Sequence, residues 1–175
     1  KIPQKLKVNS WMAVYTPIIK KELLDLLKRY EIGKLKKFKG ILEGIENTNY
    51  KIITSKKIYI LTIFEKRVRV NDLPFFINLM THLFNKKFSC PQPISDKNGQ
   101  IINKIKEKSC VLISFLKGKK SNKITSTQCK KVGKILSSLH NKTHDLKQKR
   151  RNGLSYNQWK NIFKKCKSSK LKKDK

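Results

Sequence analysis

Acidic residues and arginine are both scarce in this sequence. Its 175 residues include 11 Asp and Glu against 43 Lys and Arg, for a formal net charge of +32. Such a charge normally indicates a polyanionic partner. Only five of the 43 basic residues are arginine, however, and arginine is the side chain whose planar fork fits bases and phosphates. Because lysine is spread along the whole chain beside Ile and Asn, we favour A+T-rich codon bias over a nucleic-acid surface.

Metal-binding and membrane-spanning patterns are missing as well. The cysteines (Cys90, Cys110, Cys129 and Cys166) show no C-x-x-C spacing, and the histidines (His82, His140 and His144) complete no metal pattern. No apolar run approaches the roughly 20 residues that cross a bilayer. Residues 1–11 lack the apolar stretch of a secretory signal. We therefore expect a soluble, cytoplasmic protein whose cysteines pack as small apolar side chains.

The first part of the chain predicts one helix followed by three strands. Thr16 is a good N-cap, Pro17 a good first helical residue, and Gly33 a stop signal. Residues 38–42, 49–54 and 58–64 are rich in Ile, Tyr, Phe and Thr, which predicts a three-stranded antiparallel meander. A second helix should follow over residues 72–84, with Asp72 as its N-cap.

Two more strands and two more helices are predicted after residue 90. Asn98-Gly99 is a strong two-residue turn signal, and we expect it to join a strand at 100–105 to another at 110–116. Thr125 and Gln128 match a capping box at the start of an amphipathic helix. A last helix carries Trp159, Ile162, Phe163 and Cys166 at helical spacing, and its apolar stripe has no evident partner.

This order predicts an α+β fold of the protein-kinase-like type. A five-stranded antiparallel sheet with one inserted helix would form the small lobe, followed by the first helices of an incomplete helical large lobe. In that layout the first two strands meet in a turn over the nucleotide phosphates, where glycine lets the backbone approach the anion. The segment FKGILEGIENTNYKIIT supplies such a turn at residues 38–54.

A series of ordered motifs resembles the homoserine kinases of the aminoglycoside-phosphotransferase-like superfamily. They are Met12-Ala-Val-Tyr-Thr16, Gly40-Ile41, Glu43-Gly44, Glu46-Asn47-x-Asn49-Tyr50, Leu61-Thr62-x-Phe64-Glu65-Lys66-Arg67-Val68, Asp72-Leu73-Pro74-Phe75-Phe76, Leu79-Met80-x-His82-Leu83, Cys90-Pro91-x-Pro93, Ser114-Phe115-Leu116-x-Gly118, Leu139-His140 and RRNGLSYNQW. The resemblance runs from Met12 to about Trp159, which is nearly the whole chain but about the first half of the family's length.

The resemblance implies transfer of the γ-phosphate of ATP to the side-chain hydroxyl of homoserine, a step toward threonine. The implied nucleotide-binding residues are Gly44, Glu46, Asn47, Asn49 and Tyr50 in the turn, Thr62 at the usual third-strand Lys position, and Ser114, Phe115 and Leu116 in the connector beside adenine. The asparagines could equally be turn caps, and Phe115 and Leu116 a buried strand end.

Several charged residues leave alternatives open. A basic residue near Thr62, such as Lys66 or Arg67, could replace the usual third-strand Lys. Glu65 and Asp72 could pair with it, although we favour a solvated charge and a helix cap.

Catalytic residues are not found in this chain. Phosphoryl transfer needs an aspartate near the hydroxyl proton and an Asn and Asp for Mg²⁺. After Glu107 the only acids are Asp145 and Asp174, and His140 at a helix end is expected to pack or cap. We expect an inactive N-terminal fragment that handles ATP, with the Mg²⁺ ligands in the missing half.

The expected organisation has three parts. Residues 1–11 could be an upstream or non-native extension before an initiator at Met12, residues 12–118 the small lobe with its connector, and residues 119–175 the truncated start of the large lobe. Three other readings stay open: a basic nucleic-acid-binding module, a kinase-like enzyme for another hydroxyl acceptor such as choline or an aminoglycoside, and a non-catalytic remnant. The sequence gives no indication of oligomeric state.

Overall fold

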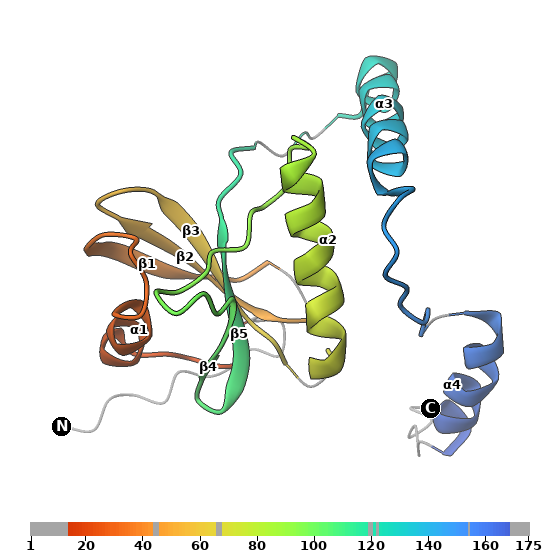
Figure 1. Ribbon diagram of the computed structural model, residues 1–175. Helices are drawn as coiled ribbons and strands as arrows, with labels where there is room; N and C mark the ends of the chain where they lie inside the picture. The colour runs from red at the N-terminus through yellow and green to blue at the C-terminus, as the bar shows by residue number, and fades with distance from the viewer. Residues whose placement is uncertain are drawn as a thin grey trace.

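The elements follow the predicted order of sheet, inserted helix, sheet and helices. The computed structural model describes residues 14–43, 46–65, 68–118, 121, 123–153 and 155–168, without the side chains of 165–168 (Figure 1). The elements are α1 (Lys20–Leu27), β1 (Leu35–Ile41), β2 (Thr48–Thr54), β3 (Ile58–Ile63), the 3₁₀ turn η1 (Val70–Asp72), α2 (Leu73–Asn85), β4 (Ile102–Ile105), β5 (Lys108–Ser114), α3 (Ser126–Thr143) and α4 (Tyr156–Ser168). None of the helices in these ranges is long and apolar enough to span a bilayer.

The five strands form one sheet in the order β1-β2-β3-β5-β4, and every neighbouring pair is antiparallel. Alternation along the strands gives the sheet two different faces. In β2, Thr48, Tyr50, Ile52 and Thr54 are buried, while the residues between them are only half-buried. The predicted α+β fold, with five antiparallel strands and a helix inserted after the third, is confirmed.

The main core lies between α1 and one face of the sheet. Leu23 and Leu26 of α1 pack into one apolar cluster with Ile52, Leu61 and Leu112. The buried residues of α2 (Leu73, Ile77 and Leu83) lie outside that cluster. Figure 1 shows α2 standing between the sheet and α3. The adjacent residues Val111 and Leu112 of β5 are both buried, so both faces of the sheet are covered there. Over β2 and β3 the residues that face away from α1 are only half-buried, and this part of the sheet can carry a site.

The start of the first helix was predicted wrongly. Helix α1 begins at Lys20, and the Ile19 amide donates to Glu22 Oε2 over 2.8 Å. Thr16 does not act as an N-cap, because it is buried and its hydroxyl donates to Glu65 Oε1 over 2.6 Å. The helix also ends at Leu27, well before Gly33.

Two predicted turns and caps also differ from the structure. Asn98-Gly99 precedes β4 and does not join β4 to β5. Lys106 and Glu107 make that connection, with φ values of 48° and 59°. Asp72 is the N-cap residue of α2, as predicted, but its side chain bonds no helical amide and instead accepts from Arg150 Nε over 2.9 Å. The β4–β5 turn is thus made by a different residue pair from the one predicted. The Asp72 carboxylate bonds a distant arginine and not the nearby helix amides.

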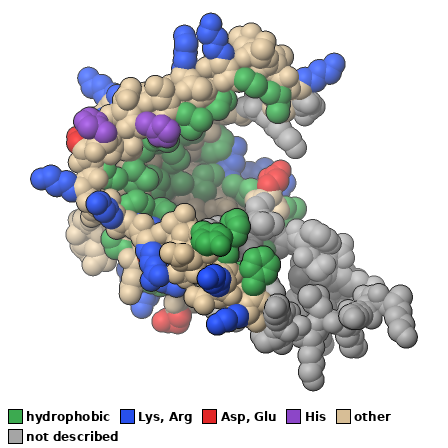
Figure 2. Space-filling model, turned by 90° about the vertical axis from the view of Figure 1, so that its right-hand side faces the viewer, with side chains coloured by type: hydrophobic (Ala, Val, Ile, Leu, Met, Phe, Trp, Pro, Cys, Tyr) green, Lys and Arg blue, Asp and Glu red, His purple; other side chains and the backbone are tan. Residues whose placement is uncertain are grey.

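Helices α3 and α4 carry large exposed hydrophobic surfaces. The capping box at the start of α3 is confirmed, since Thr125 and Gln128 bond each other's backbone amides. Figure 2 views the molecule from the side on which α3 and α4 lie in Figure 1, and it shows a hollow in which hydrophobic side chains gather. The exposed hydrophobic residues of the two helices are Val132, Ile135, Leu136, Tyr156, Trp159, Ile162 and Phe163. Cys166 lies in α4, but its side chain is outside the described part of the chain.

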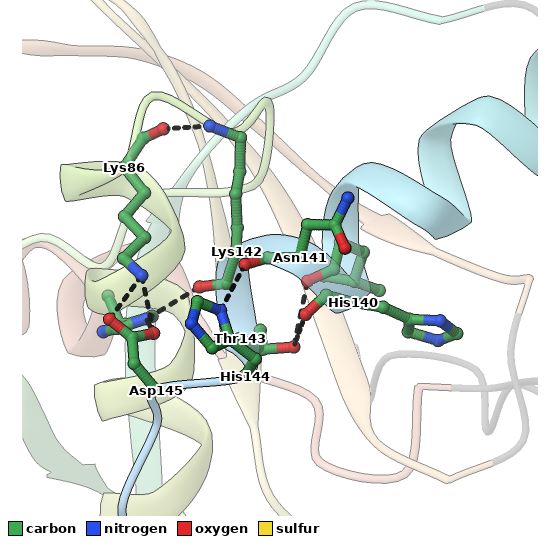
Figure 3. A network of polar contacts seen from close by, with 9 residues as sticks. Lys86, His140, Asn141, Lys142, Thr143, His144 and Asp145 are labelled. Atoms are coloured by element: carbon green, nitrogen blue, oxygen red, sulfur yellow. Dashed lines mark hydrogen bonds and ion pairs between the residues drawn. The ribbon is translucent and has the colours of Figure 1, made fainter.

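A charged network fastens the C-terminal end of α3 to α2 (Figure 3). Lys86 Nζ lies 2.5 Å from both carboxylate oxygens of Asp145, and His82 Nε2 lies 3.2 Å from one of them. Lys142 Nζ donates to the Lys86 carbonyl over 2.6 Å. The hydrogen bond from Lys86, with smaller contributions from charge, holds the pKa of Asp145 below its ordinary value despite partial desolvation. Asp145 is thus committed to this junction.

Replacing glycine by alanine should have opposite effects on stability at two positions of the chain. Gly33 has φ +84°, and a Cβ there would meet the Ser55 hydroxyl, whereas Gly133 lies inside α3 with open space around it. We expect Gly33→Ala to lower the free energy of unfolding by at least about 1 kcal/mol, because left-handed backbone is strained for alanine. Gly133→Ala should instead raise helix stability by roughly 0.5–1 kcal/mol. Urea unfolding followed by circular dichroism measures both, and equal effects would contradict the assignment.

Candidate functional site

Polar side chains from two central strands meet on the sheet face opposite α1. Asn49 of β2 and Thr62 of β3 are directly paired, and Thr62 Oγ1 donates to Asn49 Oδ1 over 2.8 Å. Lys51 follows Asn49 by two residues, so it lies on the same face. Two of the expected nucleotide-binding residues are therefore in contact, with a cation on the same face.

The turn between β1 and β2 is tied to the end of β3. Glu65 N donates to Asn47 Oδ1, and Asn49 Nδ2 donates to the Asn47 carbonyl, each over 3.4 Å. Both asparagines thus brace the turn, as the capping interpretation predicts. Glu46 is exposed at the end of the turn. Gly44, the expected glycine of the turn, lies outside the described residues.

The Glu65 carboxylate organises the base of this turn. Its Oε1 accepts from Thr16 Oγ1 over 2.6 Å and from Thr48 Oγ1 over 2.8 Å, and its Oε2 pairs with Lys108 Nζ. Only 11% of the Glu65 side chain is exposed, so the expectation of a solvated charge is wrong. Burial raises the pKa of Glu65, but the hydrogen bonds from Lys108, Thr16 and Thr48 outweigh it and leave the pKa lowered. Glu65 is therefore an ionised structural anchor.

Tyr50 belongs to the same anchor and faces away from the polar face. Its hydroxyl donates to the Thr16 carbonyl over 3.1 Å and accepts from Ile18 N over 3.0 Å. The side chain is buried, and its ring centroid lies 6.1 Å from that of Phe38. Tyr50 thus holds the segment before α1 against the core side of the sheet, and it does not reach the face that carries Asn49.

The connector after β5 begins at the other end of this polar face. Ser114 closes β5, donates its amide to the Gln92 carbonyl over 2.9 Å, and accepts the Gln92 amide at its hydroxyl over 2.8 Å. Phe115 comes next, with Lys51 Nζ 4.5 Å from its ring centroid. Leu116 is 46% exposed. Phe115 and Leu116 are therefore not a fully buried strand end, and the predicted connector is accessible.

Lys51 and Lys108 were missed by the sequence reasoning. The signal for Lys51 was its two-residue spacing from Asn49, which places both on one face of a strand. Lys108 gave no local signal, because it meets Glu65 across 43 positions of sequence. The two basic residues proposed near Thr62, Lys66 and Arg67, lie outside the described residues.

A cleft of about 480 Å³ opens beside the turn. It is lined by Glu46 from the turn, by Arg69 and Asp72 before α2, and by Arg150 and Arg151 before α4. The Arg150 guanidinium lies 5.0 Å from the Phe76 ring centroid while its Nε is bonded to Asp72. The cleft thus combines three guanidinium groups with two carboxylates.

The described residues do not form a magnesium site. They contain no group of three or more His, Cys, Asp or Glu side chains that could hold a metal ion. Among the acids after Glu107, Asp145 is engaged with Lys86 and His82, and Asp174 lies outside the described residues. The His140 ring is exposed and points away from the Asp145 network in Figure 3, so it neither packs nor caps as expected.

Comparison with known proteins gives a consistent result. Residues 37–167 match the phosphotransferase enzyme family. Over 152 residues, covering 87% of this chain, the sequence is 43% identical to a homoserine kinase of Rhodopseudomonas palustris (strain TIE-1) and 44% identical to one of Agrobacterium fabrum (strain C58). Those alignments cover 46% and 47% of the relatives, so the chain spans about half the length of the curated relatives it matches.

Solved structures share the fold at much lower identity. A spectinomycin phosphotransferase in complex with ADP and spectinomycin superposes with a TM-score of 0.60 and 16% identity, covering 87% of this chain and 47% of that one. A microcompartment-associated aminopropanol kinase gives 0.57 and 14%, covering 77% and 43%. The predicted kinase-like fold is confirmed by these similarities.

Replacing the Glu65 carboxylate tests the anchor. We expect Glu65→Gln to lower the free energy of unfolding by about 1–3 kcal/mol at neutral pH, because an amide cannot match the charge-assisted bonds from Lys108. Since the folded-state pKa of Glu65 is lowered, its contribution is present above the ordinary value of 4.5 and is lost as the pH falls below it.

Urea unfolding across pH 7 to pH 3 measures both effects. The loss of stability with falling pH should be shallower in Glu65→Gln than in the unchanged protein, and Glu31→Gln, at an exposed position, serves as the control. An identical pH slope in all three proteins would contradict the anchoring role.

Proposed function

This chain belongs to the phosphotransferase enzyme family, and from that premise we propose that the protein it comes from transfers the γ-phosphate of ATP to the side-chain hydroxyl of homoserine. The observation that carries the proposal is the 43–44% identity to homoserine kinases over 87% of the chain. The ordered motifs from Met12 to Trp159 support the same acceptor. The product would be a phosphate ester on the way to threonine, and the cytoplasmic location stays a prediction.

We propose that the described residues supply the nucleotide-holding half of the enzyme. Residues 12–118 would be the small lobe with its connector, and residues 119–175 the first helices of the large lobe. The base near the acceptor hydroxyl and the Mg²⁺ ligands would come from sequence outside these 175 residues, since the described acids do not assemble a metal site. When bound, Mg²⁺ would neutralise phosphate charge.

The chain's own residues would position ATP between the turn and the connector. Amides of the turn at Gly44 and Glu46 would face the phosphates, with Asn47, Asn49 and Tyr50 bracing it. The backbone of Ser114, Phe115 and Leu116 would meet the adenine edge. Thr62 occupies the third-strand position of the usual Lys, so we propose that Lys51, one strand away on the same face, supplies the cation instead. Its ammonium group would turn from the Phe115 ring toward the phosphates.

Enzyme assays of the full-length protein test the activity. We expect ADP release that depends on L-homoserine, with choline and an aminoglycoside such as spectinomycin giving turnover lower by several orders of magnitude. A coupled ADP assay, with mass spectrometry of the product, measures this. Faster phosphorylation of choline or of the aminoglycoside would keep the fold and overturn the acceptor.

Replacing Lys51 tests the proposed phosphate cation. We expect Lys51→Met to raise the KM for ATP by roughly 10-fold, as the loss of one charge-assisted contact predicts, with little change in the KM for homoserine. Lys20→Met, at an exposed position on α1 across the sheet, is the matched control. An unchanged KM for ATP would exclude Lys51 and direct attention to Lys66 or Arg67.

A further inference from the structure

Three of the chain's five arginines line one cleft. Arg69, Arg150 and Arg151 border the cleft of about 480 Å³ beside Glu46, and none of its described lining residues is a lysine. Lysine outnumbers arginine by 38 to 5 in this chain, so a cleft whose described basic lining residues are all arginine departs strongly from the general composition. Arginine differs from lysine in presenting a rigid fork of donors that fits a planar oxyanion with two bonds.

The Arg150 side chain is already oriented for such a ligand. Its ring contact with Phe76 and its Nε bond to Asp72 fix the plane of the guanidinium, while 36% of the side chain stays exposed. Within the described part of the chain, no other residue accepts a hydrogen bond from this guanidinium, and the Arg69 and Arg151 side chains form no ion pair. Donors on the arginines are thus available to a ligand in the cleft.

The charge of the cleft selects among anions. Three arginines against Glu46 and Asp72 leave a formal surplus of one positive charge among the described lining residues. A single carboxylate matches that surplus, whereas the several negative charges of a triphosphate exceed it. The position agrees, because the cleft borders the turn that would cover the γ-phosphate, and the acceptor must reach that phosphate from the adjoining space.

We propose that this cleft is the subsite for the α-carboxylate of the amino-acid acceptor, held by Arg150 together with Arg151. The inference rests on the proposed function, and it names the residues that would select the acceptor by its carboxylate. It explains how residues at the start of the large lobe could discriminate an amino acid from an amino alcohol of the same length. A site built to pair with a carboxylate rejects an analogue that lacks it, since the guanidinium groups are then left unpaired.

The experiment pairs variants of the protein with variants of the substrate. The kcat/KM of the full-length protein is measured for L-homoserine and for 3-aminopropan-1-ol, which is homoserine without its carboxylate. The unchanged protein should prefer homoserine by roughly 10- to 100-fold through each arginine contact. Arg150→Met and Arg151→Met should each lose that factor for homoserine and leave 3-aminopropan-1-ol nearly unaffected, with an unchanged KM for ATP.

Two further variants sharpen the result. Arg150→Lys keeps the charge but not the fork, and should recover only part of the preference. Lys149→Met removes an exposed neighbouring charge that does not line the cleft, and should behave like the unchanged protein. Arg151→Met guards against a folding defect in the Arg150 variants, because the Arg151 side chain forms no ion pair with another described residue.

The outcomes separate this inference from the proposed function. Equal losses of kcat/KM for both substrates in the arginine variants would show that the cleft does not bind the carboxylate. The proposal of homoserine phosphorylation would still stand. A raised KM for ATP with unchanged substrate preference would identify a phosphate site and overturn the inference. Absence of homoserine phosphorylation in the unchanged protein would overturn both. A loss of preference confined to homoserine would establish the subsite.

Discussion

The Glu65 carboxylate is the contact on which the described part of the molecule depends. It joins four segments of the chain: the residues before α1, the start of β2, the end of β3 and the start of β5. A single ionised group satisfies two hydroxyl donors and one ammonium there, so the cost of its burial is offset within the network. Because Asn47 bonds the Glu65 amide, the turn that would cover the phosphates is held by the same anchor.

The residues that stabilise the fold and the residues of the candidate site lie on opposite faces of the sheet. The face of the sheet toward α1 contains the anchor and the apolar core, and the opposite face carries Asn49, Lys51 and Thr62. The period of two along each strand therefore assigns alternate residues to structure and to the candidate site. Tyr50 and Asn49 are adjacent in sequence, yet Tyr50 bonds the residues before α1 on the core side while Asn49 faces the polar side.

The sequence predicted the parts of the fold that depend on local composition and local motifs. The Ile, Tyr, Phe and Thr content located β1 to β3, and the Thr125–Gln128 pair located the start of α3. The errors occurred where a local signal competed with a distant partner: Thr16 looks like an N-cap but bonds Glu65, and Asp72 looks like a cap but bonds Arg150.

The candidate site likewise contains residues that sequence motifs identified and contacts that they did not. The resemblance of motifs selected Asn47, Asn49 and Thr62, which lie together, but no spacing rule could bring Arg150 beside Asp72 across 78 positions. Contacts of that length are set by the folded topology, and short-range patterns in the sequence do not reveal which distant residues meet.

The insertion of α2 between β3 and β5 governs the order in which the sheet can assemble during synthesis. Strands β1 to β3 form a local meander, but β3 occupies the middle of the sheet and its second neighbour, β5, starts 45 residues after β3 ends. Until that stretch leaves the ribosome, the outer edge of β3 has unpaired amides and carbonyls and could recruit another chain. At about 5–20 residues per second, that interval lasts some seconds. Translation speed across residues 64–107 would therefore influence the yield of correctly folded protein.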